Sequence, residues 1–377
     1  MSGSTAQTVP ISFGSGAFQT LANHLPSGPL LLVTSPGAEA RGWTAHALAL
    51  MHDRRVRLLD RVTPNPEISF LDEEAGRLPT GMGGVVAVGG GSVIDTGKVM
   101  AALAAGPRGP AGERLTLREL LVRGEGVAFG LPIVAVPTTA GSGSEATPTA
   151  TVWDGQAKRK WSLEGPGLLP GAAIVDPELT LSAGEELTVS SGLDALSHGL
   201  EALWNRRATY RSDALAGNAV RLALDTLPKL LDDPGDPALR ARMSEASLLA
   251  GRAIAHTRST LAHALSYPLT AHFGVPRGLA CGFTLLEILR MNALNAPERT
   301  HEIARLTAHP SLAALERKLA GLLKRVGASR RVLGYGVTPG TLPSDVFAQM
   351  VSSERAANHS PPVSETDARL ILERSLA

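Results

Sequence analysis

The first half of the chain carries short, continuous apolar runs separated by segments of helical length. Four such runs lie at residues 29–34, 56–59, 84–88 and 131–136. A strand covered on both faces forms a continuous apolar run, whereas a strand with one wet face alternates apolar and polar residues. Helix-like segments at 43–51 and 93–105 lie between these runs. The pattern predicts βαβ units and a buried, Rossmann-like parallel sheet.

The pattern changes after residues 176–181. From about Glu185 onward, apolar residues recur at helical spacing, and Pro and Gly stand at the joints between helices. We therefore predict two domains: an α/β domain at 1–183 and an all-α domain at 184–377. A chain of 377 residues is long enough for each domain to bury a core of its own.

Charge and cysteine content narrow the function classes. The 36 Lys and Arg residues balance 35 Asp and Glu residues, which gives no reason to expect nucleic acid or an anionic membrane as a partner. A single cysteine, Cys281, excludes an internal disulfide framework and fits a reducing compartment. The N-terminus lacks the features of a signal peptide, and no apolar run approaches the roughly 20 residues of a membrane span. We expect a cytoplasmic protein.

Two loops rich in glycine and hydroxyl groups follow consecutive predicted strands, at residues 89–98 and 137–145. Glycines let a ligand approach the backbone, and the N-terminus of the next helix offers N–H groups to phosphate. Ser92 could cap that helix or bind a phosphate oxygen. The alternatives are a purely structural turn and a polar loop, and for the basic residues 158–160 a solvated hairpin edge. Two such loops at neighbouring strand ends favour a nucleotide site.

Asp194 and His198 are four residues apart, so on a helix they project from one face. A carboxylate and an imidazole at this spacing can supply two ligands of a divalent metal site, although such a pair can also simply hydrogen-bond inside the core. His263 stands at the head of a short helix predicted to end at Pro268. It is either the third ligand or a hydrogen-bonded core residue.

These motifs together resemble the iron-containing (group III) alcohol dehydrogenase family. The resemblance rests on their order: Gly-Gly-Gly-Ser-x-x-Asp, Pro-Thr-Thr-x-x-Ser-x-x-Glu, Asp-Ala-x-x-His, His-Ala-x-x-x-Pro-Leu and x-Pro-x-Gly. Each motif is short, but the order and spacing are specific and extend from Phe13 to the final helix. The Ser-Tyr-Pro-Leu sequence after His263 is similar to the phosphonoacetaldehyde reductase branch of phosphonate metabolism.

The resemblance implies the architecture shared with dehydroquinate synthase, with the active site between an N-terminal cofactor domain and a C-terminal helical domain. It implies NAD or NADP as hydride carrier and a divalent ion, iron or zinc, that polarises the carbonyl. Residues that match the family's cofactor contacts are Gly90, Gly91, Ser92, Asp95, Thr138, Thr139, Ser142 and Lys160. Residues that match metal ligands are Asp194, His198 and His263.

Three positions depart from the family pattern. Arg277 stands where the family has its fourth metal ligand, a histidine, and Tyr267 replaces a second histidine after the third ligand. Where the family often has an acid for the ribose hydroxyls, this chain has Ser35, which removes a repulsion against a 2′-phosphate and admits NADPH. His263, Tyr267 and Arg277 are our candidates for catalytic groups.

Arg277 is open to three interpretations, because arginine stays protonated and cannot coordinate a cation. It could face away while three ligands and water hold a metal in the manner of catalytic zinc. It could bind an anionic group of the substrate beside a weakened metal site. It could also replace the metal as the electrophile, since a guanidinium stabilises oxyanion charge.

We expect a homodimeric enzyme that reduces a small, possibly anionic aldehyde with NAD(P)H, most specifically phosphonoacetaldehyde to 2-hydroxyethylphosphonate. One alternative is a metal-independent relative such as a maleylacetate reductase. Another, outside enzymes, is a nucleotide-binding pseudoenzyme. Retention of Asp194, His198 and His263 argues against the pseudoenzyme, because drift has no reason to spare three ligands together.

Overall fold

The computed structural model describes residues 8–110, 112–338, 340–343 and 345–377. It contains two compact units. The first comprises the described residues up to Thr138 together with Ser144–Asp154 and Lys160–Leu179. The second comprises Thr139–Gly143, Gly155–Arg159 and Thr180–Ala377. Among the described residues, no helix combines the length and apolar character that crossing a bilayer requires.

The first unit is built on a six-stranded sheet in the order β1-β8-β5-β4-β2-β3, with every neighbouring pair parallel. Its strands are β1 (Ile11–Phe13), β2 (Leu30–Val33), β3 (Val56–Leu59), β4 (Gly84–Gly89), β5 (Ile133–Pro137) and β8 (Ala172–Val175). Strands β6 (Thr149–Asp154) and β7 (Arg159–Glu164) pair as a separate ribbon. The predicted parallel sheet is confirmed, and the four apolar runs are β2, β3, β4 and β5.

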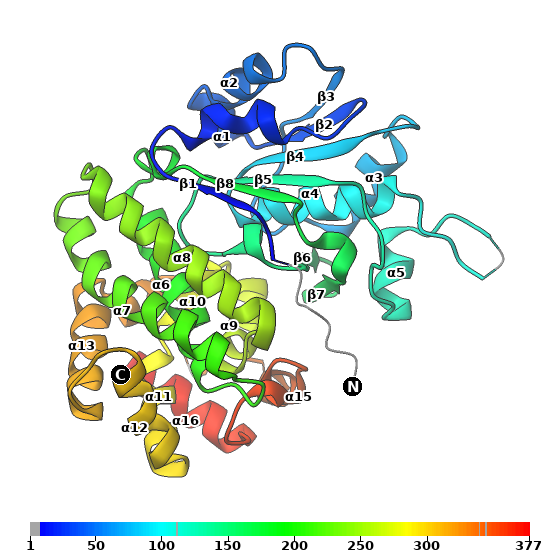
Figure 1. Cartoon of the computed structure of the whole chain (residues 1–377). Coiled ribbons are helices and arrows are strands. Elements are labelled where there is room, and N and C mark those ends of the chain that lie inside the picture. The colour runs from blue at the N-terminus through cyan, green and yellow to red at the C-terminus, as the bar shows by residue number, and fades with distance from the viewer. Residues whose placement is uncertain (1–7, 111, 339, 344) are drawn as a thin grey trace. The chain divides into compact units, whose positions relative to one another are not determined.

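Helices cover both faces of this sheet, which is why its central strands are apolar throughout. Helices α1 (Pro36–Ala40) and α2 (Trp43–Leu50) lie over one face, and α3 (Ile68–Gly76), α4 (Gly91–Ala104) and α5 (Leu117–Arg123) over the other (Figure 1). Alternate residues of each strand enter the two cores: Leu30 and Leu32 face the α2 side, and Leu31 and Val33 face the α4 side. Short 3₁₀ helices span Ala17–His24, Ser144–Ala146, Pro166–Leu168 and Pro177–Thr180.

The register of β4 against β5 sets the position of the two glycine-rich loops. Gly89, the last residue of β4, lies opposite Pro137, the last residue of β5, and Thr138 N donates to Gly89 O at 3.0 Å. Since parallel strands end at the same edge of a sheet, both loops leave that edge from adjacent strands. This confirms the prediction that the loops follow neighbouring strand ends.

The second unit is helical. Its helices are α6 (Glu185–Leu203), α7 (Tyr210–Asp232), α8 (Pro237–Thr257), α9 (Leu261–Phe273), α10 (Arg277–Gly282), α11 (Leu285–Asn295), α12 (Pro297–Leu306), α13 (Leu312–Arg325), α14 (Ala328–Leu333), α15 (Val346–Ser352) and α16 (Glu365–Leu376), with a 3₁₀ turn at Ala356–Asn358. Helix α6 packs against α7, α8 and α10 (Figure 1). The predicted apolar stripe of α6, Leu193, Leu196, Leu200 and Leu203, is fully buried.

Helix α9 ends later than the sequence predicts. Helix α9 does not end at Pro268 but continues to Phe273, with Pro268 inside it. Proline removes one backbone hydrogen bond, but Leu269 and Thr270 beyond it are buried, and their packing outweighs that loss. The helix ends instead at Gly274, whose φ of 71° is the left-handed conformation that glycine adopts readily.

Candidate functional site

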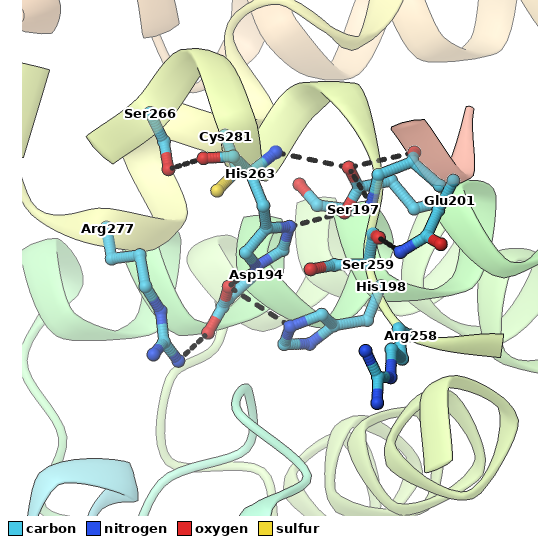
Figure 2. Close-up of polar contacts among 12 residues, drawn as sticks. Asp194, Ser197, His198, Glu201, Arg258, Ser259, His263, Ser266, Arg277 and Cys281 are labelled. Atoms are coloured by element: carbon cyan, nitrogen blue, oxygen red, sulfur yellow. Dashed lines mark hydrogen bonds and ion pairs between the residues drawn. The ribbon is translucent and has the colours of Figure 1, made fainter. Parts of the chain in front are cut away.

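Asp194, His198 and His263 converge in the interior of the second unit. Asp194 and His198 project from one face of α6, and His263 from the start of α9 (Figure 2). Asp194 Oδ1 lies 3.8 Å from His198 Nε2 and 3.5 Å from His263 Nε2. The two imidazoles stack with their centroids 4.6 Å apart, and all three side chains are buried.

His198 is oriented by the loop of residues 139–143. Its Nδ1 lies 3.4 Å from Gly141 O, and a carbonyl can only accept, so this contact assigns the proton to Nδ1. Nε2 is then left with its lone pair facing Asp194. Burial, more than the neighbouring cations, lowers the pKa of His198 to about 4, so the ring is neutral near pH 7 and suited to coordinate a cation.

His263 is oriented by Glu201, a fully buried carboxylate two helical turns after Asp194. Glu201 Oε2 accepts from His263 Nδ1, while Oε1 accepts from His263 N at 3.1 Å and Thr260 N at 3.0 Å. Burial raises the pKa of Glu201, but His263 more than offsets this and keeps it lowered. Glu201 therefore directs Nε2 of His263 toward Asp194, as carboxylates behind metal-binding histidines do.

Two atoms at the centre of this cluster have no hydrogen-bond partner among the residues that the structure describes: Asp194 Oδ1 and His263 Nε2. Leaving such buried groups unsatisfied is costly. One ligand atom from each of Asp194, His198 and His263 lies within 4.8 Å of the others. Two imidazole nitrogens and a carboxylate oxygen suit a divalent cation with one open position, so these residues fit the metal that the resemblance implied.

Arg277 begins α10 and donates from Nη2 to Asp194 Oδ2 at 2.8 Å (Figure 2). The expectation that it could face away from the cluster is wrong. The reason is the close packing of α10 on α6: a Cβ at Gly278 would lie 1.9 Å from Ser190 O and 2.9 Å from Asp194 Cβ. Burial raises the pKa of Asp194, but Arg277 and the imidazoles outweigh it and hold that pKa well below its usual range. Arg277 thus engages Oδ2 and leaves Oδ1 to face the histidines.

Tyr267 lies on α9 one turn after His263 and is half-buried. The side chain follows His263 along the same helix face. Its catalytic role stays a prediction.

The first glycine-rich loop leads into the N-terminus of α4. The helix begins at Gly91 with Gly90 as its cap residue, two residues earlier than a cap at Ser92 requires. Ser92 Oγ instead accepts from Asn65 N at 3.3 Å. The turn is tight, since a Cβ at Gly89 would lie 2.5 Å from Val93 Cγ2. Backbone N–H groups at Gly91 and Ser92 are therefore the candidate phosphate donors.

Asp95 and the buried Lys98 link this helix to the segment after the second loop. Asp95 accepts from Ser144 Oγ at 2.6 Å and Thr151 N at 3.0 Å, so both carboxylate oxygens are engaged within the unit. Lys98 Nζ donates to Ser144 O at 2.7 Å and Thr149 O at 2.8 Å, and burial lowers its pKa to about 8. The structure gives Asp95 a positioning role for this segment, a role that sequence analysis did not foresee.

The remaining candidates for cofactor contact lie on both units. Thr138 is buried at the end of β5, whereas Thr139 and Ser142 belong to the short segment that joins the second unit. Lys160 on β7 donates to Ser162 Oγ. Ser35 caps α1, accepting from Ala38 N at 3.3 Å. Their roles with a cofactor stay predictions.

Two functionally placed residues were missed by sequence analysis, Glu201 and Lys98. Glu201 completes an Asp-x-x-x-His-x-x-Glu pattern whose three polar side chains share one face of α6. That spacing was a usable signal. Lys98 had no comparable signal, because its partners are backbone and hydroxyl oxygens 46 to 51 residues away along the chain.

Comparison with known proteins identifies the family that the sequence motifs resemble. Residues 9–177 match the model of the iron-containing alcohol dehydrogenases, and residues 188–375 match the model of the C-terminal part of that family. The chain belongs to the iron-containing alcohol dehydrogenase family. It is 36% identical over 334 residues to phosphonoacetaldehyde reductase of Streptomyces viridochromogenes, which covers 84% of this chain and 82% of that protein.

Solved structures agree with the family in fold. Sulfoacetaldehyde reductase from Bifidobacterium kashiwanohense, in complex with NAD+, is 28% identical with a TM-score of 0.87, covering 99% of this chain and 98% of that one. An iron-containing alcohol dehydrogenase from Thermotoga maritima is 28% identical with a TM-score of 0.84, covering 98% of both chains. The predicted family and fold class, an α/β sheet domain followed by an all-α domain, are confirmed.

Proposed function

We propose that this protein reduces a small aldehyde to the alcohol with NAD(P)H and a proton, and that its physiological substrate is phosphonoacetaldehyde. The observation that carries the proposal is the buried meeting of Asp194 Oδ1, His198 and His263 Nε2, two of these atoms lacking any hydrogen-bond partner within the described chain. The relatives named above, a phosphonoacetaldehyde reductase and a sulfoacetaldehyde reductase, support an aldehyde with an anionic head group.

The chain's own residues prepare this site. A divalent ion held by Asp194, His198 and His263 would polarise the carbonyl oxygen, while the nicotinamide supplies hydride to the carbon. Glu201 fixes the His263 tautomer and Gly141 O fixes that of His198, so both Nε2 atoms point to one place. Arg277 binds Asp194 Oδ2, which confines the carboxylate to one ligand oxygen. The buried setting strengthens these electrostatic interactions.

The overall reaction is tested with protein purified without chelator. We expect bound iron or zinc and oxidation of NADH or NADPH that depends on phosphonoacetaldehyde, with 2-hydroxyethylphosphonate as product. Active protein without metal under any loading condition would favour the metal-independent, maleylacetate reductase-like alternative, with Arg277 as electrophile. Protein that binds nucleotide but turns over no aldehyde would favour the pseudoenzyme.

Arg277 is proposed to help neutralise the substrate's head group, because a phosphonate brings one to two negative charges and arginine suits charge-assisted hydrogen bonds. Its side chain is 24% exposed, so an incoming anion can reach it. Arg277→His would restore the family's ligand set. We expect that variant to bind metal more tightly yet to lose about tenfold in kcat/KM for phosphonoacetaldehyde, about 1.4 kcal/mol, but not for propanal. Parallel changes with both aldehydes would show that Arg277 has no role toward the anion.

The N-terminus of α4 is proposed as the pyrophosphate site of the cofactor. Gly91→Val places a β-branched side chain where the backbone N–H groups must be approached closely. We expect cofactor affinity, measured by fluorescence titration, to fall at least about tenfold, or 1.4 kcal/mol. Val122→Ala, at an exposed position of the same unit, is the matched control. Equal affinity in Gly91→Val and wild type would exclude this placement.

We also propose a homodimer in the cytoplasm. The buried Cys281 is consistent with a reducing compartment. Serine in place of an acid at position 35 supports use of NADPH as well as NADH.

A further inference from the structure

Arg258 has a backbone conformation that only glycine adopts without strain. It follows the last residue of α8, with φ at 68° and ψ at 172°. A Cβ disfavours this region strongly, so a residue with a side chain persists there only when its surroundings dictate the conformation. Such residues cluster at functional sites, where the strain is retained for a reason.

Hydrogen bonds around Arg258 hold its backbone in this conformation. Its N–H donates to Ile254 O at 2.7 Å, and its carbonyl accepts from Asn205 Nδ2 at 3.0 Å and Thr257 Oγ1 at 3.1 Å. Two residues later, Thr260 N and Oγ1 both donate to Glu201. The turn is thus fastened to the carboxylate that orients His263. A glycine would satisfy every one of these backbone contacts without the strain, so the side chain of Arg258 is what needs an explanation.

That side chain stands on the turn that leads into α9 and His263, and Thr260 of this turn donates to Glu201. In the view of Figure 2, the ring of His198 lies between the guanidinium groups of Arg258 and Arg277. Arg258 Nη1 pairs with Glu354, whose side chain is 66% exposed, while that of Arg258 is 30% exposed. An ion pair with so exposed a carboxylate is weak and is readily exchanged for another anion.

We propose that Arg258 is a specificity-determining residue that binds the anionic head group of the aldehyde, exchanging Glu354 for the substrate's oxyanions. This inference rests on the proposed function and deepens it. A phosphonate carries up to two negative charges, and Arg277 is already engaged by Asp194. A second guanidinium, on the turn that leads into His263, would supply the remaining charge and a planar set of donors that matches the oxygens around phosphorus.

The decisive variant is Arg258→Gly, which removes the guanidinium and relieves the backbone. We expect kcat/KM for phosphonoacetaldehyde to fall about tenfold or more, mainly through KM, while that for propanal changes less than about threefold. Thermal unfolding should move upward by a few degrees, because glycine accepts this conformation. A drop in phosphonoacetaldehyde activity together with a higher melting temperature cannot come from general damage to the fold.

Two further variants make the test independent of that one substitution. Glu354→Gln removes the competing carboxylate and should lower KM for phosphonoacetaldehyde severalfold, with propanal unaffected. Arg325→Ala, which breaks an exposed arginine–aspartate pair elsewhere in the unit, should change neither substrate. Lower KM in Glu354→Gln supports the exchange of partners even if Arg258→Gly proves insoluble.

The outcomes separate this inference from the proposed function. The first case is that Arg258→Gly lowers kcat/KM equally for both aldehydes, or for neither, while the wild type reduces phosphonoacetaldehyde. Arg258 then does not bind the head group, and the proposed function stands. If wild type reduces propanal but discriminates against phosphonoacetaldehyde, the substrate class is wrong and this inference falls with it. If wild type reduces no aldehyde with NADH or NADPH, the proposed function itself is overturned.

Discussion

His198→Ala is expected to reduce bound metal and aldehyde turnover together, with kcat/KM falling by about 100-fold or more, or some 2.7 kcal/mol of transition-state stabilisation. The substitution removes one of three ligand atoms and leaves Asp194 with one fewer partner in a buried position. A site with three protein ligands is expected to bind metal more weakly than a site with four, so the loss of one more ligand should lower metal occupancy strongly. Metal content after loading with Fe²⁺ or Zn²⁺, followed by NADH oxidation on the same sample, measures both quantities.

His301→Ala serves as the control for this variant. His301 is an exposed histidine on α12 whose Nδ1 contacts only Pro297 O among the hydrogen bonds seen there, so its loss should alter neither metal nor rate. A His198→Ala protein that keeps full metal but loses turnover would make His198 a catalytic group and not a ligand. Full turnover with full metal would remove it from the site altogether.

Glu201→Gln is expected to weaken metal binding by about 10- to 100-fold although Glu201 touches no candidate ligand atom that faces the centre. A glutamine oxygen at Oε1 can still accept from Thr260 N and His263 N. Its amide nitrogen, however, would face His263 Nδ1, where two donors cannot meet. His263 must then move its proton to Nε2, the atom that faces Asp194, and can no longer offer a lone pair there.

The change in metal affinity and the change in the His263 tautomer can be measured separately. Chelator competition gives the metal affinity, and NMR of ¹⁵N-labelled histidine reports which ring nitrogen carries the proton. Glu287→Gln, which alters a buried carboxylate paired with Arg290, is the matched control and should leave both measurements unchanged. Unaltered tautomer and affinity in Glu201→Gln would show that Glu201 supports the turn at Thr260 and nothing more.

The architecture of this protein could be predicted from its sequence alone. The strands at residues 30–33, 84–89 and 133–137 are apolar at every position because helices cover both faces of the sheet. A continuous apolar run of this kind can be recognised in the sequence. The helix that carries Asp194 and His198 could also be predicted, since its leucines and its two polar residues recur at helical spacing. The face on which a residue of a helix lies depends only on its spacing from nearby residues, so it can be predicted from a short stretch of sequence.

The contacts between side chains of different helices could not be predicted from the sequence. The approach of α10 to α6 at Gly278 turns Arg277 onto Asp194, which no spacing in the chain could indicate. Burial of Leu269 carries α9 past Pro268 against its local preference. Glu201 meets His263 across 62 residues, and the strained turn at Arg258 is held by Ile254 O and Asn205 Nδ2. Such contacts depend on how helices pack, and packing is a property of the whole core and not of any one stretch of sequence.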